Sequence, residues 1–600
     1  MPRAPRTIVD LLVRASRSHD TGLRLLDRGG AETWMPWAAV FDRARAAAAR
    51  LIAIGVRRGD RVGLVFATEA AFFDALFGVM LAGAVPVPLY PPVRLGRLDE
   101  YRARTSRMLQ TVGARLLLTS RRAYHILGEV TRDARPGLGC RVLDVGSGLK
   151  ARGPTNDLLR WDPRSSDRRP IAGISPSDIG LIQFSSGTVA EPKAAALTHD
   201  ALVAQATLLN GFWPDTPEIR HSGVSWLPLY HDMGLIGCVF TAVERPGTLT
   251  LVPPEAFVAR PAIWLQTISR YRASLSPAPN FAYSLAAQRI RDEEMAGVDL
   301  SCWRIALCGA ETVLPDVMRA FQSRFARWGL APETLTPVYG LSEAALAVTF
   351  SDIARPFVSR RFDRQSLARD GVAVEAEAGR ELVSVGRAVP GFDVRIVTDA
   401  GTRLPEGRVG LVECRGPSIM ERYENNSQAT RSVFHDGWLR TGDLGFLRKG
   451  ELFLTGRRKD VLIVRGANHS PEEVEGAVQP VDGVRTGCAV AVSWLPDGAD
   501  GEQVLVFVEA RRGVAHDAYE QIAVACKGRV IAATGLGVET VVVLAPGTLP
   551  RTSSGKLRRQ ETLRRYLAGT LRPAPTPTRA RMARAVARSA LAHVRARLRT

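Results

Sequence analysis

Lysine and cysteine are scarce in this chain of 600 residues. Only six lysines occur among the 80 basic residues, so arginine supplies almost all of the positive charge. The seven cysteines are scattered and form no CxxC pair, which argues against a disulfide framework and against a zinc site. Because this usage suits a reducing compartment, we expect a cytoplasmic protein.

Long apolar runs are also missing. The first residues lack the apolar core of a signal peptide. The most apolar stretch, residues 75–87, is too short and too rich in Gly and Pro to span a bilayer. The Walker A spacing GxxxxGK[ST] and the carrier-protein motif GxDSL are absent too. The shortness of the apolar runs therefore predicts no transmembrane segment.

Acidic residues are fewer than basic ones, 60 against 80, which gives a formal charge of +20. Such an excess favours an acidic partner, which could be nucleic acid, an anionic membrane, an acidic protein or a phosphorylated substrate. No RNA- or DNA-binding signature accompanies the arginines, so we do not expect nucleic acid.

Helix-like and strand-like segments alternate through most of the chain, which predicts crossover units and mostly parallel sheets. Short strands separated by Gly and Pro over residues 383–420 predict a small antiparallel or barrel-like subdomain. Residues 459–567 alternate again at the scale of a small α+β domain. A Pro-rich linker and a basic tail follow over residues 571–600.

The tail is arginine-rich but has one apolar face. Ala587, Leu591, Val594 and Leu598 share a side of a predicted helix, and arginines occupy the other sides. A solvated tail is the commoner fate of such a segment, and peripheral contact with an anionic membrane is the alternative.

The first chemical motif is QFSSGTVAEPKAAALTH, residues 183–199. A strand over residues 179–184 leads into a turn with hydroxyls and free backbone N–H groups, before a predicted helix. Such a turn suits a phosphate chain, and Lys193 could neutralise an outer phosphate. A Ser/Thr/Gly loop in isolation is usually just a loop, so this motif needs support from others.

Four further motifs follow in order: CGAE at residues 308–311, VYGLSE at 338–343, TGD and GRRKD within 441–460, and PRTSSGK at 550–556. Together with the loop they resemble the adenylate-forming superfamily of acyl-CoA synthetases, luciferases and adenylation domains. Ala190 and Ala194 depart from this pattern, because many members carry glycine there. Each motif alone could be an ordinary turn, whereas all of them in order cannot easily arise by chance.

The resemblance implies an α/β fold. A large N-terminal AMP-binding domain, residues 1–458, would contain two αβ subdomains and a small β-barrel-like subdomain. A small mobile α+β C-terminal domain, residues 459–570, would carry the catalytic lysine and turn about Lys459. The resemblance further implies ATP and Mg²⁺ as cofactors and a monomeric enzyme.

The resemblance also implies roles for individual residues. Lys556 would bridge the substrate carboxylate and the α-phosphate, and Glu343, with Thr188, would hold Mg²⁺. Tyr339 would contact adenine, Asp443 the ribose hydroxyls, and Arg457 the ribose or phosphate. The complete set of implied nucleotide contacts is Ser185, Ser186, Gly187, Thr188, Lys193, Gly309, Ala310, Glu311, Tyr339, Gly340, Ser342, Asp443 and Arg457.

Three segments resemble the fatty acyl-AMP ligase branch in particular: SWLPLYHDMGLIG at residues 225–237, PNFAY at 279–283 and LIVRGANHSPEEVE at 462–475. The resemblance makes His231 a catalytic residue that gates the carboxylate. The expected acyl pocket consists of Met233, Leu235, Cys238 and Phe281, although apolar residues of this kind more often simply pack in a core.

The branch also carries an extra segment, which residues 351–380 resemble; we call it the insertion. In the family it restrains the C-terminal domain and disfavours CoA. A fatty acid would then be activated as its adenylate and passed to an acidic acyl carrier protein or a polyketide synthase carrier domain. The alternatives are a fatty acyl-CoA synthetase and a non-catalytic nucleotide-binding member.

Overall fold

The computed structural model describes residues 5–92, 98–120, 123, 127, 141–144, 173–185, 193–216, 219–464, 467–496, 502–552 and 555–573. The basic tail and most of the phosphate loop, including Ser186, Gly187 and Thr188, lie outside these residues. Among the described residues, no helix has the length and apolar character needed to cross a membrane.

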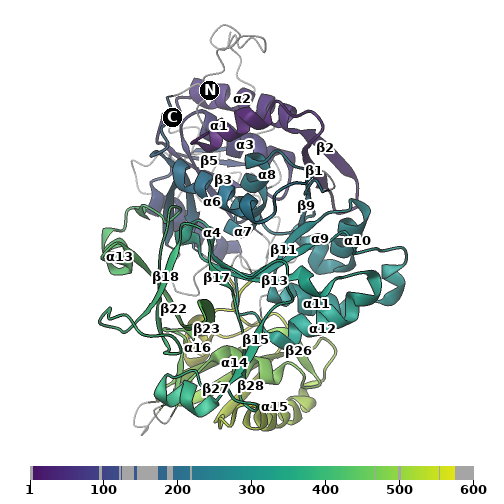
Figure 1. The fold of residues 1–600 in the computed structure, drawn as a ribbon, viewed down its shortest axis with the longest axis vertical. Coiled ribbons are helices and arrows are strands. Elements are labelled where there is room, and N and C mark those ends of the chain that lie inside the picture. Colours follow the sequence, from purple (N-terminus) through teal and green to yellow (C-terminus); the bar gives the residue numbers. More distant parts are fainter. Residues whose placement is uncertain are drawn as a thin grey trace.

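A nine-stranded sheet forms the centre of the large domain (Figure 1). Its inner strands are all parallel, and antiparallel strands close both edges. The order across the sheet is β17 (Arg387–Ala388), β14 (Ala347–Phe350), β13 (Leu335–Gly340), β12 (Ile305–Gly309), β11 (Leu275–Pro279), β9 (Gly223–Ser225), β10 (Leu249–Leu251), β1 (Gly22–Leu26) and β2 (Glu32–Pro36).

Two further sheets complete the αβ part. One is wholly parallel, in the order β4 (Val85–Leu89), β3 (Arg61–Val65), β5 (Leu116–Thr119) and β6 (Arg141–Asp144). The other is antiparallel and consists of β20 (Arg422–Tyr423), β8 (Ala194–Thr198) and β7 (Ile179–Phe184). The expected crossover pattern is therefore present in two of the three sheets.

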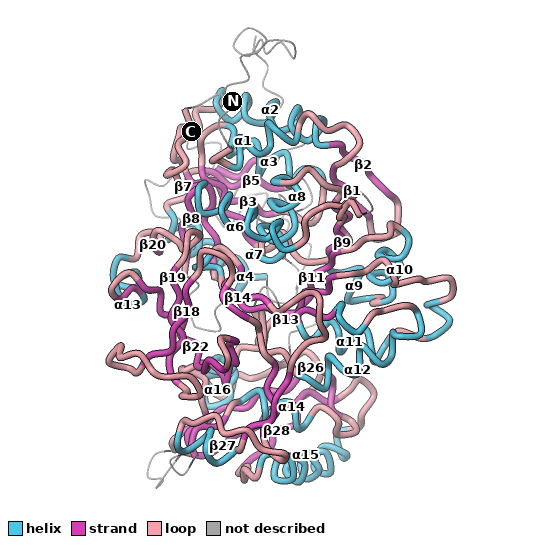
Figure 2. The backbone as a smooth tube through the Cα atoms, in the orientation of Figure 1, coloured by secondary structure: helices cyan, strands magenta, loops and turns pink. Residues whose placement is uncertain are grey.

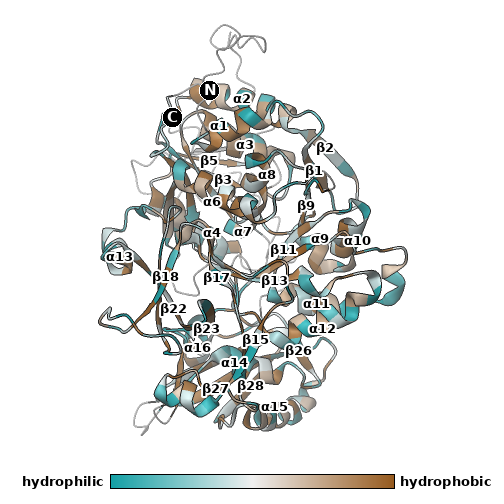
Figure 3. Cartoon of the chain, viewed as in Figure 1, coloured by the Kyte–Doolittle hydropathy of each residue, from teal (hydrophilic) through white to brown (hydrophobic). Residues whose placement is uncertain are grey.

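Helices cover these sheets, as Figure 2 shows in cyan. In chain order they are α1 (Ile8–Ala15), α2 (Trp37–Ala53), α3 (Ala70–Leu81), α4 (Leu98–Val112), α6 (His199–Phe212), α7 (Asp232–Gly234), α8 (Thr241–Glu244), α9 (Pro254–Ala259), α10 (Ala262–Arg270), α11 (Asn280–Arg289), α12 (Pro315–Phe325) and α13 (Ser427–Val433). α3 is almost completely buried, and its residues are brown in Figure 3.

One local prediction is wrong. The phosphate loop does not lead into a helix but into β8, which pairs with β7 as an antiparallel hairpin. The Ala-rich segment 194–197 is buried between neighbouring strands, and this tertiary setting overrides the helix preference of alanine. Helix α6 begins only after Thr198, whose side chain accepts a hydrogen bond from Ala201 N at 3.2 Å and caps it.

The small subdomain predicted from short strands is an antiparallel sheet. It contains β18 (Asp393–Val397), β19 (Gly410–Arg415), β22 (Trp438–Arg448), β21 (Phe434–His435) and β23 (Glu451–Arg457). The insertion contains β15 (Ser359–Phe362) and ends at the first residue of β16 (Arg380–Val383), which pairs antiparallel with β15. Strands β22 and β23 pair antiparallel, with an irregularity between Leu444 and Gly445, and Asp443 lies opposite Arg457.

Residues after 460 form their own apolar cores. The strands are β24 (Leu462–Val464), β25 (Ala467–His469), β26 (Val484–Trp494), β27 (Gln503–Ala510) and β28 (Thr540–Leu544), and the helices are α14 (Pro471–Val478), α15 (Tyr519–Thr534) and α16 (Arg559–Leu567). This part is drawn in green and yellow at the bottom of Figure 1, below the nine-stranded sheet.

One arginine ties this small part together. Arg559, at the start of α16, pairs with Asp460 at 3.0 Å, Glu472 at 2.9 Å and Glu475 at 2.7 Å. All four side chains are largely buried, so the guanidinium compensates three carboxylates that water does not reach freely.

We expect Arg559→Met to destabilise the C-terminal part by about 3–5 kcal/mol, because it leaves buried carboxylates without a counter-ion. Hydrogen exchange read by mass spectrometry should show lost protection of α14 and α16. Arg564→Met is the matched control, since Arg564 is exposed and pairs with Glu561 on its own helix. Equal protection in the two variants would contradict this role for Arg559.

Candidate active site

Most of the predicted site residues meet at the carboxyl ends of β12 and β13, where open α/β sheets bind their ligands. β12 ends at Gly309 and leads to Ala310, which has a positive φ of 65°. The next residue, Glu311, accepts a hydrogen bond from Phe281 N at 2.6 Å, and burial raises its pKa. β13 ends at Gly340, where a Cβ would lie 1.7 Å from Leu346 O, so only glycine fits there.

The residues implied for adenine and ribose are in direct contact. Tyr339 donates its hydroxyl hydrogen to Asp443 Oδ2 at 2.6 Å, and Arg457 Nε pairs with Asp443 Oδ1 at 3.0 Å. Asp443 is buried, and its negative charge raises the pKa of Arg457. The large-domain sheet and the barrel-like sheet thus place one aromatic ring, one carboxylate and one guanidinium together.

A second corner contains the predicted metal ligand. Glu343 Oε1 accepts a hydrogen bond from Tyr423 OH at 2.7 Å, and Lys193 Nζ lies 4.7 Å from the centre of the Tyr423 ring. Burial, followed by the charge of Lys459, lowers the pKa of Lys193. Glu343, Lys193 and Lys459 are therefore neighbours, although sequence separates them widely.

The donor set at this corner fits magnesium bound through a nucleotide. In the part of the chain that is described, no group of three or more His, Cys, Asp or Glu side chains could hold a metal. Mg²⁺ commonly uses one or two carboxylates and takes its other ligands from substrate phosphates and water. A single carboxylate beside two lysines matches that pattern, with Glu343 as the protein ligand.

His231 belongs to a buried hydrogen-bonded group. Its Nδ1 lies 2.6 Å from Asp232 Oδ1, and Ser342 donates its hydroxyl hydrogen to Asp232 Oδ2. Burial raises the pKa of Asp232, but His231 and the two hydrogen bonds outweigh it and hold that pKa well below its usual range. An ionised Asp232 orients the imidazole through Nδ1 and leaves Nε2 for a ligand.

Lys556 reaches this group from the small part of the chain. Burial and the charge of Arg457 lower the pKa of its ammonium, whereas Asp232, Glu311 and Asp443 raise it. Its backbone is fixed by a hydrogen bond from Lys556 N to Thr552 Oγ1 at 3.0 Å and another from Thr552 N to Lys556 O at 2.7 Å. The residues predicted for the chemical step, which are far apart in sequence, therefore share one centre.

The predicted hinge lies between two anchored neighbours. Arg458 pairs with Asp399 of the large domain at 2.7 Å, and its N–H donates to Gly442 O at 3.1 Å. Asp460, on the other side, pairs with Arg559. Lys459 itself is exposed.

The four residues expected in the acyl pocket divide between two apolar clusters that adjoin each other, since Cys238 Sγ donates to Met233 O at 3.3 Å. Met233 and Phe281 belong to one apolar cluster with Trp226, whose ring centre is 6.0 Å from that of Phe281. Leu235 and Cys238 are buried in a different cluster. Leu235 and Cys238 both belong to a π-helical turn over Leu235–Phe240, and the acyl pocket stays a prediction.

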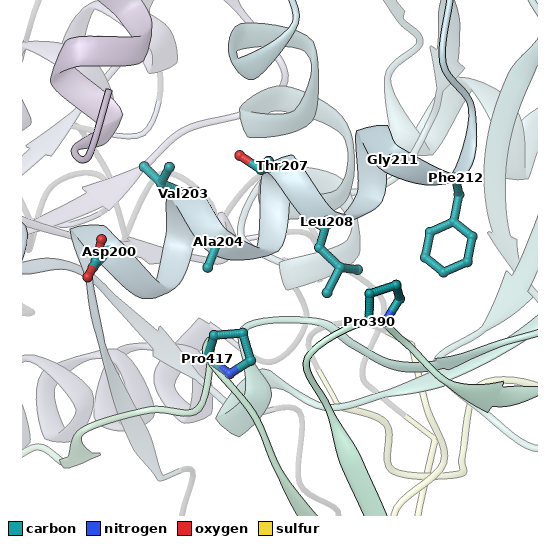
Figure 4. A pocket seen from close by; sticks show the side chains of 9 residues that line it. All are labelled: Asp200, Val203, Ala204, Thr207, Leu208, Gly211, Phe212, Pro390 and Pro417. Carbon is teal, nitrogen blue, oxygen red and sulfur yellow. The ribbon is translucent and has the colours of Figure 1, made fainter. Parts of the chain in front are cut away.

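Of the predicted phosphate loop, Ser185 and Lys193 are described. Ser185 N donates to Lys193 O at 2.8 Å, which closes the base of the loop. A pocket of about 470 Å³ lies elsewhere, between α6 and the loops that carry Pro390 and Pro417 (Figure 4). None of the predicted site residues lines it.

Sequence reasoning missed three residues of the site. Asp232 and Tyr423 contact the predicted residues directly, and Gln183 donates to Tyr230 O at 2.7 Å beside them. Asp232 follows His231 directly, and that adjacency was a usable signal. Nothing near Tyr423 in the sequence indicates its contact with Glu343.

The profile of the family described as AMP-binding enzyme matches residues 15–424. The chain belongs to this family. A Caulobacter vibrioides relative, provisionally named an acyl-CoA synthetase, is 35% identical to this AMP-binding enzyme over 92% of this chain and 94% of its own. Long-chain-fatty-acid–AMP ligase FadD26 of Mycobacterium marinum is 32% identical over 94% of this chain and 98% of its own.

A solved structure from studies of fatty acyl-adenylate ligases from E. coli and L. pneumophila superimposes with a TM-score of 0.84. It is 32% identical and covers 94% of this AMP-binding enzyme and 98% of its own chain. The predicted adenylate-forming fold and the predicted resemblance to fatty acyl-AMP ligases are thereby confirmed. The use of ATP follows from membership of this family.

We expect Lys556→Ala to slow ATP–pyrophosphate exchange roughly 10²–10³-fold with little change in ATP binding, since a cation there acts mainly on the transition state. In the wild type, the rate should fall as pH rises through the lowered pKa of Lys556, below the value of 10.5 for a free lysine. Lys556→Arg should retain its charge and lose that alkaline limb. An unchanged pH profile in Lys556→Arg would contradict this assignment.

Proposed function

We propose that this AMP-binding enzyme is a fatty acyl-AMP ligase that activates a fatty acid and passes the acyl group to a carrier protein. The observation that carries the first step is the position of Lys556 near Asp443 and near Asp232, which pairs with His231. Adenylate formation needs a charged lysine, an oriented imidazole and a carboxylate that can accept hydrogen bonds from ribose hydroxyls, and this centre has all three. The names of FadD26 and of the ligase structures support the fatty acid as substrate.

The first reaction is an in-line displacement. A carboxylate oxygen of the fatty acid attacks the α-phosphorus of ATP, the bond to the β-phosphate oxygen breaks, and pyrophosphate leaves. Lys556 holds the carboxylate against the α-phosphate, while Lys193 and Ser185 hold the outer phosphates. Mg²⁺ at Glu343 would offset phosphate charge. Since no covalent enzyme intermediate is required, positioning and electrostatics supply the rate.

In the second reaction a thiolate of the carrier's pantetheine attacks the acyl carbonyl carbon. The bond from that carbon to the AMP oxygen breaks, AMP leaves, and the thiol proton passes to solvent. Rotation of the C-terminal domain about Lys459 would withdraw Lys556 and admit the thiol.

The insertion supports a carrier protein, rather than CoA, as acceptor. Phe362 is fully buried against Phe446 and Phe453, with ring centres 5.0 and 5.6 Å away, so the insertion is docked on the barrel-like sheet. It also contacts the small domain, because Arg364 and Arg380 both pair with Glu473 of α14. Because the insertion is docked on the large domain and also forms ion pairs with α14, it would restrict rotation of the small domain.

Two alternatives remain to be compared. The name of the Caulobacter relative favours an acyl-CoA synthetase, which performs the same first reaction. A non-catalytic nucleotide-binding member is less well supported, because the contacts of Asp443, Arg457 and His231 are all intact. Acyl-CoA formation by the unaltered protein would decide for the synthetase.

We expect Glu343→Gln to raise the Mg²⁺ concentration needed for half-maximal adenylate formation about tenfold or more, because the carboxylate charge is lost. A metal titration of pyrophosphate release measures this. Glu421→Gln, an exposed acid nearby, is the control and should titrate like the wild type. If both variants match the wild type, another group binds the metal.

We expect Arg364→Ala combined with Arg380→Ala to permit some acyl-CoA synthesis while the adenylation rate stays unchanged. The reason is that both ion pairs from the insertion to Glu473 are lost. Arg360→Ala is the control, because Arg360 pairs with Glu375 inside the insertion. Thioester formation with CoA and with a holo-carrier protein should be measured separately by mass spectrometry.

A further inference from the structure

Tyr423 of β20 is a buried tyrosine that contacts both charged groups proposed to act on the outer phosphates. The residue is 4% exposed. Its hydroxyl donates a hydrogen bond to Glu343 Oε1 at 2.7 Å, and the centre of its ring lies 4.7 Å from Lys193 Nζ. One side chain therefore contacts the predicted metal ligand with its polar end and the predicted phosphate ligand with its aromatic face.

These two contacts leave both charged groups available to a nucleotide. A carboxylate and an ammonium that share one neighbour attract each other. In the part of the chain that the structure describes, however, Lys193 forms no ion pair. The Tyr423 hydroxyl binds one carboxylate oxygen of Glu343 and leaves the other for a metal. The ring attracts the ammonium through its face and leaves the N–H donors of Lys193 for phosphate oxygens.

Strand pairing sets the position of Tyr423. The residue lies opposite Ala195 of β8, the strand that begins directly after Lys193. Three residues earlier, Met420 N donates to Glu343 O at 2.7 Å. The segment that contains β20 thus holds the main chain of Glu343 as well as its carboxylate, and it places the tyrosine ring beside the lysine.

We propose that Tyr423 is a positioning residue that keeps Glu343 and Lys193 from pairing with each other, so that the carboxylate can bind Mg²⁺ and the ammonium can bind phosphate. The inference rests on the roles proposed above for these two residues in ATP binding. A group that hydrogen-bonds to a metal ligand orients it and commonly contributes roughly 10–100-fold to metal affinity. The aromatic spacer adds a second effect, because it prevents the two ligands from neutralising each other before ATP arrives.

Binding of ATP without fatty acid tests this proposal, because no reaction can follow. Isothermal titration gives one Kd with Mg²⁺ and one with EDTA, and we call their ratio the magnesium gain. Tyr423→Phe keeps the ring but lacks the hydroxyl. Its Kd in EDTA should equal that of the wild type, whereas its magnesium gain should fall about tenfold. Tyr423→Leu also lacks the ring, so its Kd in EDTA should weaken about fivefold, since ATP must first break an ion pair between Lys193 and Glu343.

A double variant distinguishes a spacer from simple orientation of the carboxylate. If Lys193 pairs with Glu343 in Tyr423→Leu, removal of the ammonium should release the carboxylate. Adding Lys193→Met to Tyr423→Leu should therefore raise the magnesium gain to the level of Tyr423→Phe. Lys193→Met in the wild-type background should leave the magnesium gain unchanged. An equal gain in Tyr423→Leu and in the double variant would overturn the spacer role.

Tyr271 provides the matched control, because it makes the same two kinds of contact at the edge of the nine-stranded sheet. Its hydroxyl donates to Glu32 Oε2 at 2.6 Å, and the guanidinium carbon of Arg24 lies 4.2 Å from the centre of its ring. Tyr271→Phe and Tyr271→Leu should bind ATP like the wild type, with and without Mg²⁺. The same losses in the variants of both tyrosines would assign the effect to general destabilisation and overturn the proposal.

Glu343→Gln separates failure of this inference from failure of the proposed function. A wild-type magnesium gain in Tyr423→Phe, together with a lost gain in Glu343→Gln, would overturn the role of Tyr423 alone. A wild-type gain in both variants would also remove Glu343 as the proposed metal ligand. Tyr423→Phe nearly preserves the buried shape of the side chain, so it decides the proposal even if Tyr423→Leu does not fold.

Discussion

The geometry of the site depends on placing the Lys556 ammonium where protein has largely replaced water. Burying a lone cation in such a position costs free energy, and the positive charge of Arg457 repels it further. Asp232, Glu311 and Asp443 offset that cost, and each carboxylate is itself fixed by another contact. The large domain therefore prepares the position for the lysine, and the small domain supplies it.

Several elements cooperate to keep these carboxylates in place. Asp443 is held by Tyr339 from β13 of the nine-stranded sheet and by Arg457 from β23. Asp232 is held by Ser342 from the turn after β13. Loss of one of these contacts would thus move a carboxylate and change the electrostatic field at Lys556, although the lysine itself is unaltered. The lysine and the contacts of its carboxylates therefore act as one unit.

The fold class and many residues of this site could be predicted from the sequence, because each motif specifies a local backbone conformation together with its residue types. The strand ends, the TGD motif and the SGK loop all carry residues that the structure brings close together. Partners contributed by distant segments could not be predicted in this way: Tyr423 contacts Glu343, and Glu473 contacts Arg364, without any local signal. The acyl pocket stays a prediction: Met233 and Phe281 lie in one apolar cluster, and Leu235 and Cys238 lie in the adjoining one.

The anchoring of residues 458 and 460 has a mechanical consequence. Arg458 is bonded to the large domain and Asp460 to Arg559, so the flexible connection between them has almost no length. Any large rotation of the small domain would have to occur at the φ and ψ angles next to Lys459, because the residues on both sides are held by contacts. With Lys459 as the predicted hinge, so short a connection would limit the small domain to a few orientations.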